Sequence, residues 1–217
     1  MPLDMKAIAK AVEEAKKASK ETKFTQSLDL IVTLKDIDPK KPENRFVESV
    51  ELPNQANKTV RVCVIASGDL ALRARNAKAD LVVDRDELEK LGRDKKAAKK
   101  IASSYDFFIA EAPLMPLVGK TVGGQLGPRG KMPTPVPPNA PIDSVIGRHR
   151  RLARIRLRDQ LSVQCRVGTV DMSSEKIAEN VQAVISRLEG RLEKGVRNFR
   201  RVALKTTMGA PSKVELV

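Results

Sequence analysis

Apolar residues recur along this chain at two spacings, one typical of helices and one typical of strands. Over residues 4–20 they recur every three or four positions, which predicts an amphipathic helix. Residues 27–34 and 45–52 instead alternate apolar and polar side chains, as strands with one buried face do. The N-terminal quarter of the chain therefore predicts a helix followed by two half-buried strands.

The middle of the chain follows a different pattern. Residues 59–66, 79–84 and 105–112 are short, almost continuous apolar runs, which are typical of buried parallel strands. Helical stretches separate these runs, and this alternation predicts a small three-layer α/β unit with a mainly parallel sheet. Residues 113–141 are rich in proline and glycine, and residues 142–151 are predicted as a helix.

Beyond residue 151 the pattern returns to that of the N-terminal part. Residues 152–158 and 161–168 alternate like the two strands of a hairpin, with its turn near residues 158–160. A long amphipathic helix is predicted from residue 173 or 174, where a serine can cap it, and residues 199–208 form a last strand. The C-terminal part therefore predicts more of the same helix-plus-antiparallel-sheet architecture.

These patterns predict two domains. Residues 1–59 and 152–217 form a discontinuous α+β domain with an antiparallel sheet, into which residues 60–151 are inserted as an α/β domain. The formal net charge of +14 divides into +1 over residues 1–59, +7 over 60–151 and +6 over 152–217, and the pI is about 10. Positive charge on both domains favours an extended polyanion, such as nucleic acid, over a small anionic substrate.

Membrane binding and secretion are not expected. No apolar run reaches the roughly 18 residues of a spanning helix, and the basic stretches lack aromatic anchors. The N-terminus has no hydrophobic signal region. Cys63 and Cys165 lie in apolar, strand-like runs, so we interpret them as reduced core residues of a cytoplasmic protein rather than a disulfide or metal pair.

No catalytic constellation emerges. The sequence "VGKT" at residues 118–121 resembles the end of a phosphate-binding P-loop, but Leu114 occupies the position that must be glycine. His149, the only histidine, lies among arginines and is interpreted as a structural or RNA-facing residue. We therefore predict no enzyme activity, no cofactor and no metal site. A nucleotide-binding α/β enzyme is the alternative.

Three stretches favour nucleic acid as the partner. Residues 148–158 contain six arginines, Arg150 and Arg154 among them, and such density suits contact with phosphates. The stretch "GGQLGPRGKMPTPVPP" (123–138) predicts a rigid basic loop in which Arg129 and Lys131 meet phosphates. Phe24, in "TKFTQS", is predicted either to stack on a base or ribose or to join the core.

Four motifs together resemble one family. "KFTQSLDLIVTL", "GQLGPRGKMPTP", "SSEKIAENVQAVI" and "KTTMGAP" are similar to the large-subunit ribosomal protein L-one family, and their order covers nearly the whole chain. The lysine that follows the second glycine of "GPRGKMP" resembles the archaeal branch. The resemblance implies a split α+β domain with an inserted Rossmann-like α/β domain, the same division that the patterns predict.

The resemblance also implies a function. A member of this family binds large-subunit rRNA at the mobile stalk near the tRNA exit site and assists release of deacylated tRNA. It also represses translation by binding its own mRNA leader. The implied partners are large-subunit rRNA, this mRNA leader, exit-site tRNA and other ribosomal components. Off the ribosome the protein is expected to be a monomer.

The family's main RNA surface maps by motif onto the terminal domain. The residues are Lys23, Phe24, Ser27, Arg166, Gly168, Thr169, Thr206, Thr207, Met208 and Gly209, with a secondary contact at Arg129, Lys131, Arg150 and Arg154. Gln26 stands where many members have an acid, and Ala210 separates Gly209 from a proline. Hydroxyl and backbone groups suit ribose 2′-OH groups, so we expect affinity to depend on this patch more than on the total charge.

Overall fold

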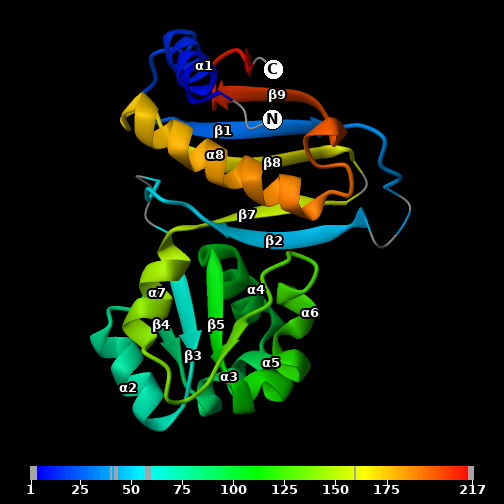
Figure 1. Ribbon diagram of the computed structural model, residues 1–217. Helices are drawn as coiled ribbons and strands as arrows, with labels where there is room; N and C mark the ends of the chain where they lie inside the picture. The colour runs from blue at the N-terminus through cyan, green and yellow to red at the C-terminus, as the bar shows by residue number, and fades with distance from the viewer. Residues whose placement is uncertain (1–3, 40, 42–43, 57–59, 159, 215–217) are drawn as a thin grey trace. The chain divides into compact units, whose positions relative to one another are not determined.

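The computed structural model describes residues 4–39, 41, 44–56, 60–158 and 160–214 (Figure 1). Its contacts divide the chain into two compact units. The terminal unit consists of Met1–Lys58 with Arg151–Val217, and the inserted unit consists of Thr59–Arg150. Each unit has its own sheet and its own core.

The terminal unit combines two helices with antiparallel strands. The helices are α1 (Met5–Lys17) and α8 (Ser174–Arg191), followed by the short 3-10 helix η3 (Gly195–Asn198). The strands are β1 (Ser27–Leu34), β2 (Phe46–Glu51), β7 (Leu152–Leu157), β8 (Ser162–Thr169), β9 (Phe199–Thr206) and β10 (Ser212–Val214). One sheet has the order β10-β9-β1-β8, and β2 pairs with β7. Figure 1 shows α1 and α8 on the same side of these strands.

The alternation of β1 explains this packing. Leu28, Leu30, Val32 and Leu34 are buried, and the residues between them are only partly buried. The buried set joins apolar residues of α1 and α8 in one core. Because side chains alternate across a strand, one face of β1 supplies this core and the other stays accessible.

A buried asparagine fastens the chain segment that follows β2 to α8. The Asn180 side chain accepts a hydrogen bond from the backbone N–H of Asn54 at 2.9 Å and donates to its carbonyl at 2.9 Å. It also donates to the Val167 carbonyl at 2.8 Å. Asn180 has no exposed surface, so these bonds form away from water and hold one end of the chain that leads out of the terminal unit.

The predicted hairpin is wrong in its pairing. Strands β7 and β8 both form, but β7 pairs with β2 and β8 pairs with β1. Alternation shows only that a segment has two unlike faces, whereas the choice of partner depends on contacts distant in sequence. Residue 159 of the predicted turn lies outside the described residues.

The inserted unit is a parallel sheet between helices. Its strands are β3 (Val62–Ile65), β4 (Leu81–Val83), β5 (Phe107–Glu111) and β6 (Thr134–Val136), in the order β4-β3-β5-β6. Its helices are α2 (Gly68–Asn76), α3 (Arg85–Arg93), α4 (Lys95–Ser104), α5 (Met115–Thr121), α6 (Gly123–Leu126) and α7 (Ile142–Arg150), with the 3-10 helix η2 (Ala112–Leu114).

Strand β3 shows why this unit has three layers. Val62 and Val64 join a core with residues of α2 and α7, whereas Cys63 and Ile65 join another with residues of α3, α4, α5 and α6. All four side chains are buried, as a strand covered on both faces requires. The predicted combination of an antiparallel α+β fold with a three-layer α/β fold is confirmed.

The prediction of a loop over residues 123–138 is wrong in part, because helix α6 and strand β6 lie within it. The proline-rich residues just before it also form elements, η2 and α5. Pro113 and Pro116 occupy first-turn positions of η2 and α5, where a proline costs no helical hydrogen bond. Pro135 lies in β6, the last strand of the sheet, where a missing N–H is tolerated. Glycine and proline content alone therefore misidentified α6 and β6.

The histidine and both cysteines are core residues. His149 is buried and its ring nitrogens contact the Val145 carbonyl at 2.7 Å and the Thr134 hydroxyl at 3.2 Å, so of the two interpretations the structural one is correct. Burial lowers the pKa of His149. Cys63 and Cys165 are free and buried, as predicted, and burial raises the pKa of each thiol to about 12.

The helices in the described part of the chain include none with the length and apolar content that a bilayer crossing requires.

Candidate nucleic-acid interface

Antiparallel pairing gathers three distant segments at one end of the terminal sheet. Strand β1 begins at Ser27, β8 ends at Thr169 and β9 ends at Thr206. Ser27 pairs with Thr169, and Leu28 pairs with Thr206. Since β1 lies between the other two strands and runs opposite to both, its start meets their ends. We call this region, Lys23–Ser27 with Arg166–Thr169 and Thr206–Gly209, the strand-end surface.

Hydrogen bonds define the turn after β9. The Thr207 N–H and hydroxyl both donate to the Ser27 carbonyl, at 3.1 and 3.3 Å. The Met208 N–H donates to Oε1 of Gln26 at 3.0 Å, and the Gly209 N–H donates to the Thr206 hydroxyl at 3.1 Å. The backbone after Met208 is thus held residue by residue before the chain reaches Ala210.

Gly209 is required by close packing. A Cβ atom at this position would lie 3.0 Å from the Ala18 carbonyl oxygen and nearer still to the Thr206 hydroxyl. A larger residue would therefore have to move the turn away from the end of α1 or break the bond to Thr206.

Two large apolar side chains project from the strand-end surface. Phe24 is 54% exposed and Met208 is 56% exposed, although neither residue type prefers water. Phe24 therefore does not join the core, and its stacking on a base or ribose stays a prediction. Both exposed side chains are available for contact with another molecule.

A carboxylate lies between two cations on the accessible face of the sheet. Asp29 of β1 pairs with Arg166 of β8 on one side and with Lys205 of β9 on the other. Partial burial raises the pKa of Asp29, and the charges of Arg166 and Lys205 oppose that shift. The Lys205 ammonium donates to the carbonyls of Thr206 and Thr207 at 3.2 and 3.0 Å. A lysine thus links the accessible face to the turn.

Two buried polar atoms at the strand-end surface lack a hydrogen-bond partner among the described residues. They are Oγ1 of Thr169 and Nε of Arg166. Such atoms cost stability unless a partner reaches them, and they cluster at sites that bind ligands.

Gly168 faces the core. A Cβ atom there would lie 3.0 Å from Ile177 of α8 and 3.1 Å from the Met172 sulfur. The missing side chain therefore lets α8 approach β8.

Two of the predicted secondary contacts bind α4 of their own unit. The Lys131 ammonium donates to the carbonyls of Ala102 and Tyr105 at 3.0 and 2.6 Å, at the C-terminal end of α4. Arg129 donates to the Ser103 hydroxyl at 2.6 Å and is half-buried. Positive charge at a helix C-terminus is stabilising, so Lys131 stabilises α4.

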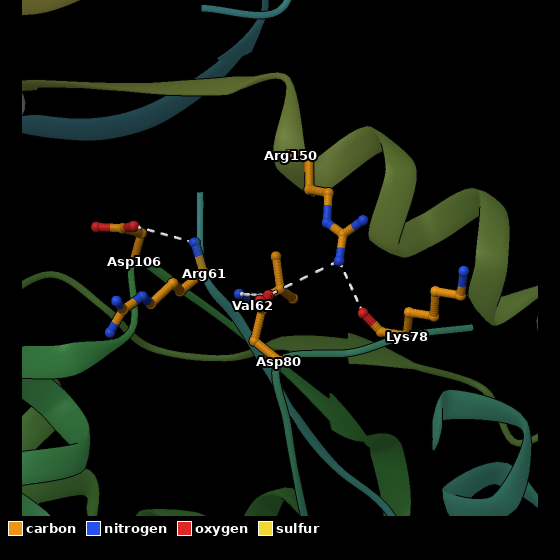
Figure 2. A network of polar contacts seen from close by, with 6 residues as sticks. All are labelled: Arg61, Val62, Lys78, Asp80, Asp106 and Arg150. Carbon is orange, nitrogen blue, oxygen red and sulfur yellow. Dashed lines mark hydrogen bonds and ion pairs between the residues drawn. The ribbon is translucent and has the colours of Figure 1, made fainter. Parts of the chain in front are cut away.

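Arg150 takes part in a polar network at the start of β3 (Figure 2). It donates to the Lys78 carbonyl at 2.8 Å and lies 3.8 Å from the Asp80 carboxylate. The same carboxylate accepts the Val62 N–H at 2.8 Å. Asp80 therefore holds both the first strand of the inserted unit and its last helix, α7. Arg154 is half-buried in β7 of the terminal unit.

Replacing Asp80 by alanine should destabilise the inserted unit by about 1–2 kcal/mol, because the Val62 N–H loses its acceptor and Arg150 its ion-pair partner. The expected loss of stability is modest because the side chains of Asp80 and Arg150 are both partly exposed. Thermal denaturation followed by circular dichroism measures the effect. Asp69→Ala is the matched control: it removes an exposed ion pair with Arg73 from the same unit and should change little. Equal stability of the two variants would contradict the role assigned to Asp80.

The candidate P-loop is excluded by its conformation. Residues 118–121 lie inside α5 and its last turn, with no preceding glycine loop to enclose a phosphate. The part of the chain that the structure describes also contains no cluster of histidine, cysteine and carboxylate side chains suited to a metal ion.

Three residues of the site could not be assigned from motifs. The sequence indicated Gln26 only as a departure from the family pattern. It indicated no role for Asp29 or Lys205. The alternation in β1 places Asp29 on the same face as Ser27, which is a usable signal. The bonds of Gln26 and Lys205 depend on the turns, and no sequence pattern specifies them.

Comparison with known proteins agrees with the fold. A model described as the ribosomal protein L1p/L10e family matches residues 8–210. The chain belongs to this family. Its relatives include proteins named large ribosomal subunit protein uL1, all from archaea. That of Methanothermobacter thermautotrophicus is 50% identical, covering 93% of this chain and 95% of the relative. That of Thermofilum pendens is 50% identical, covering 96% and 92%. That of Methanothermococcus thermolithotrophicus is 47% identical, covering 98% and 100%.

Family membership confirms the resemblance, including its archaeal character. The L1p/L10e family consists of structural ribosomal proteins, so the chain is a ribosomal protein and not an enzyme. Its location is on the ribosome, in the cytoplasm.

Proposed function

We propose that this member of the L1p/L10e family is a constituent of the large ribosomal subunit and binds large-subunit rRNA through the strand-end surface. The observation that carries this proposal is the convergence of three segments, by strand register, on one sheet end that exposes Phe24 and Met208. The name shared by the relatives supports the large subunit as the place of binding.

The chemistry of the strand-end surface suits RNA. The hydroxyls of Ser27 and Thr207 and the carbonyls around them can exchange hydrogen bonds with ribose 2′-OH groups, which DNA lacks. Phe24 offers a flat ring for a base or ribose, and Met208 adapts to an irregular surface. Lys23 and Arg166 supply positive charge for phosphates. Gly168 contributes through packing, since its Cβ position faces Ile177.

The finer roles follow from the resemblance and form part of the proposal. They are binding at the mobile stalk near the tRNA exit site, help in releasing deacylated tRNA, and repression of translation through the protein's own mRNA leader. The same strand-end surface would bind rRNA and mRNA, and the protein would be a monomer off the ribosome.

A secondary RNA contact at Arg129, Lys131, Arg150 and Arg154 stays a prediction. Lys131 and Arg150 already donate to carbonyls of the inserted unit. Arg129 is half-buried and donates to the Ser103 hydroxyl. Contact with RNA would therefore require these three side chains to keep or exchange bonds that they make within the protein.

Binding of a large-subunit stalk rRNA fragment, compared with unrelated RNA of equal length over a salt series, tests the proposal. Phosphate contacts weaken steeply with salt, whereas bonds to ribose and base groups do not. The stalk fragment should therefore remain bound at salt concentrations that release the unrelated RNA. Equal affinities and equal salt dependence for both RNAs would contradict specific recognition. Measuring the affinity for the mRNA leader in the same experiment shows whether the protein prefers rRNA or its own mRNA.

A further inference from the structure

Gln26 is a buried amide at the centre of the strand-end surface. It directly precedes β1 and is only 4% exposed, which is unusual for a glutamine. A buried amide is stable only when its donor and acceptor groups are both satisfied. The partners of this amide lie in the loops that carry the exposed residues of the surface.

The Gln26 side chain connects two loops that are far apart in sequence. Its Nε2 donates to the Lys20 carbonyl at 2.6 Å, in the loop that follows α1 and contains Lys23 and Phe24. Its Oε1 accepts the Met208 N–H at 3.0 Å, in the turn after β9. Each bond fixes a backbone group within a few residues of an exposed side chain of the surface.

The Gln26 backbone adds a third connection. Its carbonyl accepts the Val170 N–H at 3.1 Å, just beyond the end of β8. One residue thus bonds to the loop after α1, to the turn after β9 and to the residue that follows β8. Substitution of the side chain breaks the first two connections and leaves this third one in place, so the effect of the amide can be measured separately.

We propose that Gln26 is a positioning residue for RNA binding, which holds the loop after α1 and the turn after β9 in one fixed relation. The inference rests on the proposed function of the strand-end surface. Before RNA arrives, the amide already sets the backbone that carries Phe24 and Met208. A surface held in its binding conformation loses less conformational entropy on association and therefore binds more tightly.

The amide is suited to this task because it donates and accepts at once. Glutamate at this position keeps the acceptor for the Met208 N–H, but an ionised carboxylate cannot donate to the Lys20 carbonyl. Methionine has a similar length and provides no donor and only a weak acceptor. The affinity for RNA should therefore fall in the order wild type, Gln26→Glu, Gln26→Met.

Asn198 offers a matched control at the opposite end of β1. Its side chain is 2% exposed, accepts the Lys194 N–H at 3.0 Å and donates to the Lys35 carbonyl at 3.0 Å. It therefore connects two backbone segments as Gln26 does, but beyond the far end of the strand, after Leu34. Asn198→Leu should lower the stability of the terminal unit without changing the strand-end surface.

The test measures affinity of the full-length protein for the stalk rRNA fragment, together with thermal stability, for wild type, Gln26→Met, Gln26→Glu and Asn198→Leu. Gln26→Met should bind at least about tenfold more weakly, the equivalent of two modest hydrogen bonds, and Gln26→Glu should recover part of this loss. Asn198→Leu should bind within about twofold of wild type while losing comparable stability.

Two results would overturn the inference: a folded Gln26→Met protein that binds like wild type, or an Asn198→Leu protein that loses as much affinity as Gln26→Met. The second result would mean that Gln26→Met weakens RNA binding only because it lowers the stability of the terminal unit. If wild type itself does not distinguish the stalk fragment from unrelated RNA, the proposed function fails instead, and the two failures remain distinguishable.

Discussion

Met208→Asp should weaken binding of the stalk rRNA fragment by about 100-fold, which corresponds to about 2.7 kcal/mol. The change removes an apolar side chain that is 56% exposed at the strand-end surface and places a negative charge where phosphates approach. Thr207→Val keeps the shape of its residue and removes only a hydroxyl, so about a tenfold loss is expected. Filter binding or fluorescence anisotropy at fixed salt measures both.

The control for Met208→Asp is the same change at an exposed apolar residue elsewhere. Leu72 lies in α2 of the inserted unit and is 58% exposed, so Leu72→Asp alters the net charge equally. We expect the affinity of Leu72→Asp to stay within about twofold of wild type, because Leu72 is not part of the strand-end surface and one charge changes a net charge of +14 little. If both variants lost the same affinity, total charge and not the strand-end surface would govern binding.

Asn180→Leu should destabilise the terminal unit by about 3–5 kcal/mol. The N–H and carbonyl of Asn54 and the carbonyl of Val167 would lose their partners, the first two in a partly buried and the third in a fully buried position. Asn180→Asp keeps the size of the side chain and loses both donated bonds, so it should be similarly damaging. Asn76→Leu, an exposed substitution at the end of α2, is the control and should be nearly neutral.

Hydrogen exchange read by mass spectrometry separates the two units in this experiment. Peptides from α8 and the segment around Asn54 should lose protection in Asn180→Leu, whereas peptides from β3 and β5 should keep it. Denaturation of the whole protein measures the loss of stability but does not by itself show which segment has lost its bonds. Unchanged protection around Asn54 would mean that the asparagine does not hold this segment.

Most of the elements could be predicted because burial imposes its period on the sequence. The alternation of residues 27–34 predicted β1, and the continuous apolar run around Val64 predicted a strand covered on both faces. Where glycine and proline were dense, as in α6 and β6, composition gave the wrong answer. The local sequence predicts whether a residue is buried more reliably than it predicts which helix or strand packs against that residue.

The candidate site was predictable only in part, for a related reason. Motif resemblance indicated Lys23, Phe24 and the turn at Thr207, and strand register brings these segments together. Gln26 contributes through hydrogen bonds to backbone groups of Lys20 and Met208. The fold sets the positions of these groups, and every residue type carries them, so the sequence does not reveal the bonds. Likewise, charge density indicated Arg150, but in the structure its guanidinium lies beside Asp80.

The Asp80 network brings the two ends of the inserted unit together, and the terminal unit has the same property where the chain leaves and re-enters it. In the inserted unit, Asp80 brings the Val62 backbone and Arg150 to one carboxylate, so the two ends of that unit are neighbours. In the terminal unit, Glu51 pairs with Leu152, and the Leu52 N–H donates to the Arg151 carbonyl at 2.9 Å. Both interrupted ends are therefore adjacent, and a short turn closes either unit at little entropic cost. A chain in which a short turn joins Asn54 to Arg151 would keep the bonds between Asn54 and Asn180 within the terminal unit.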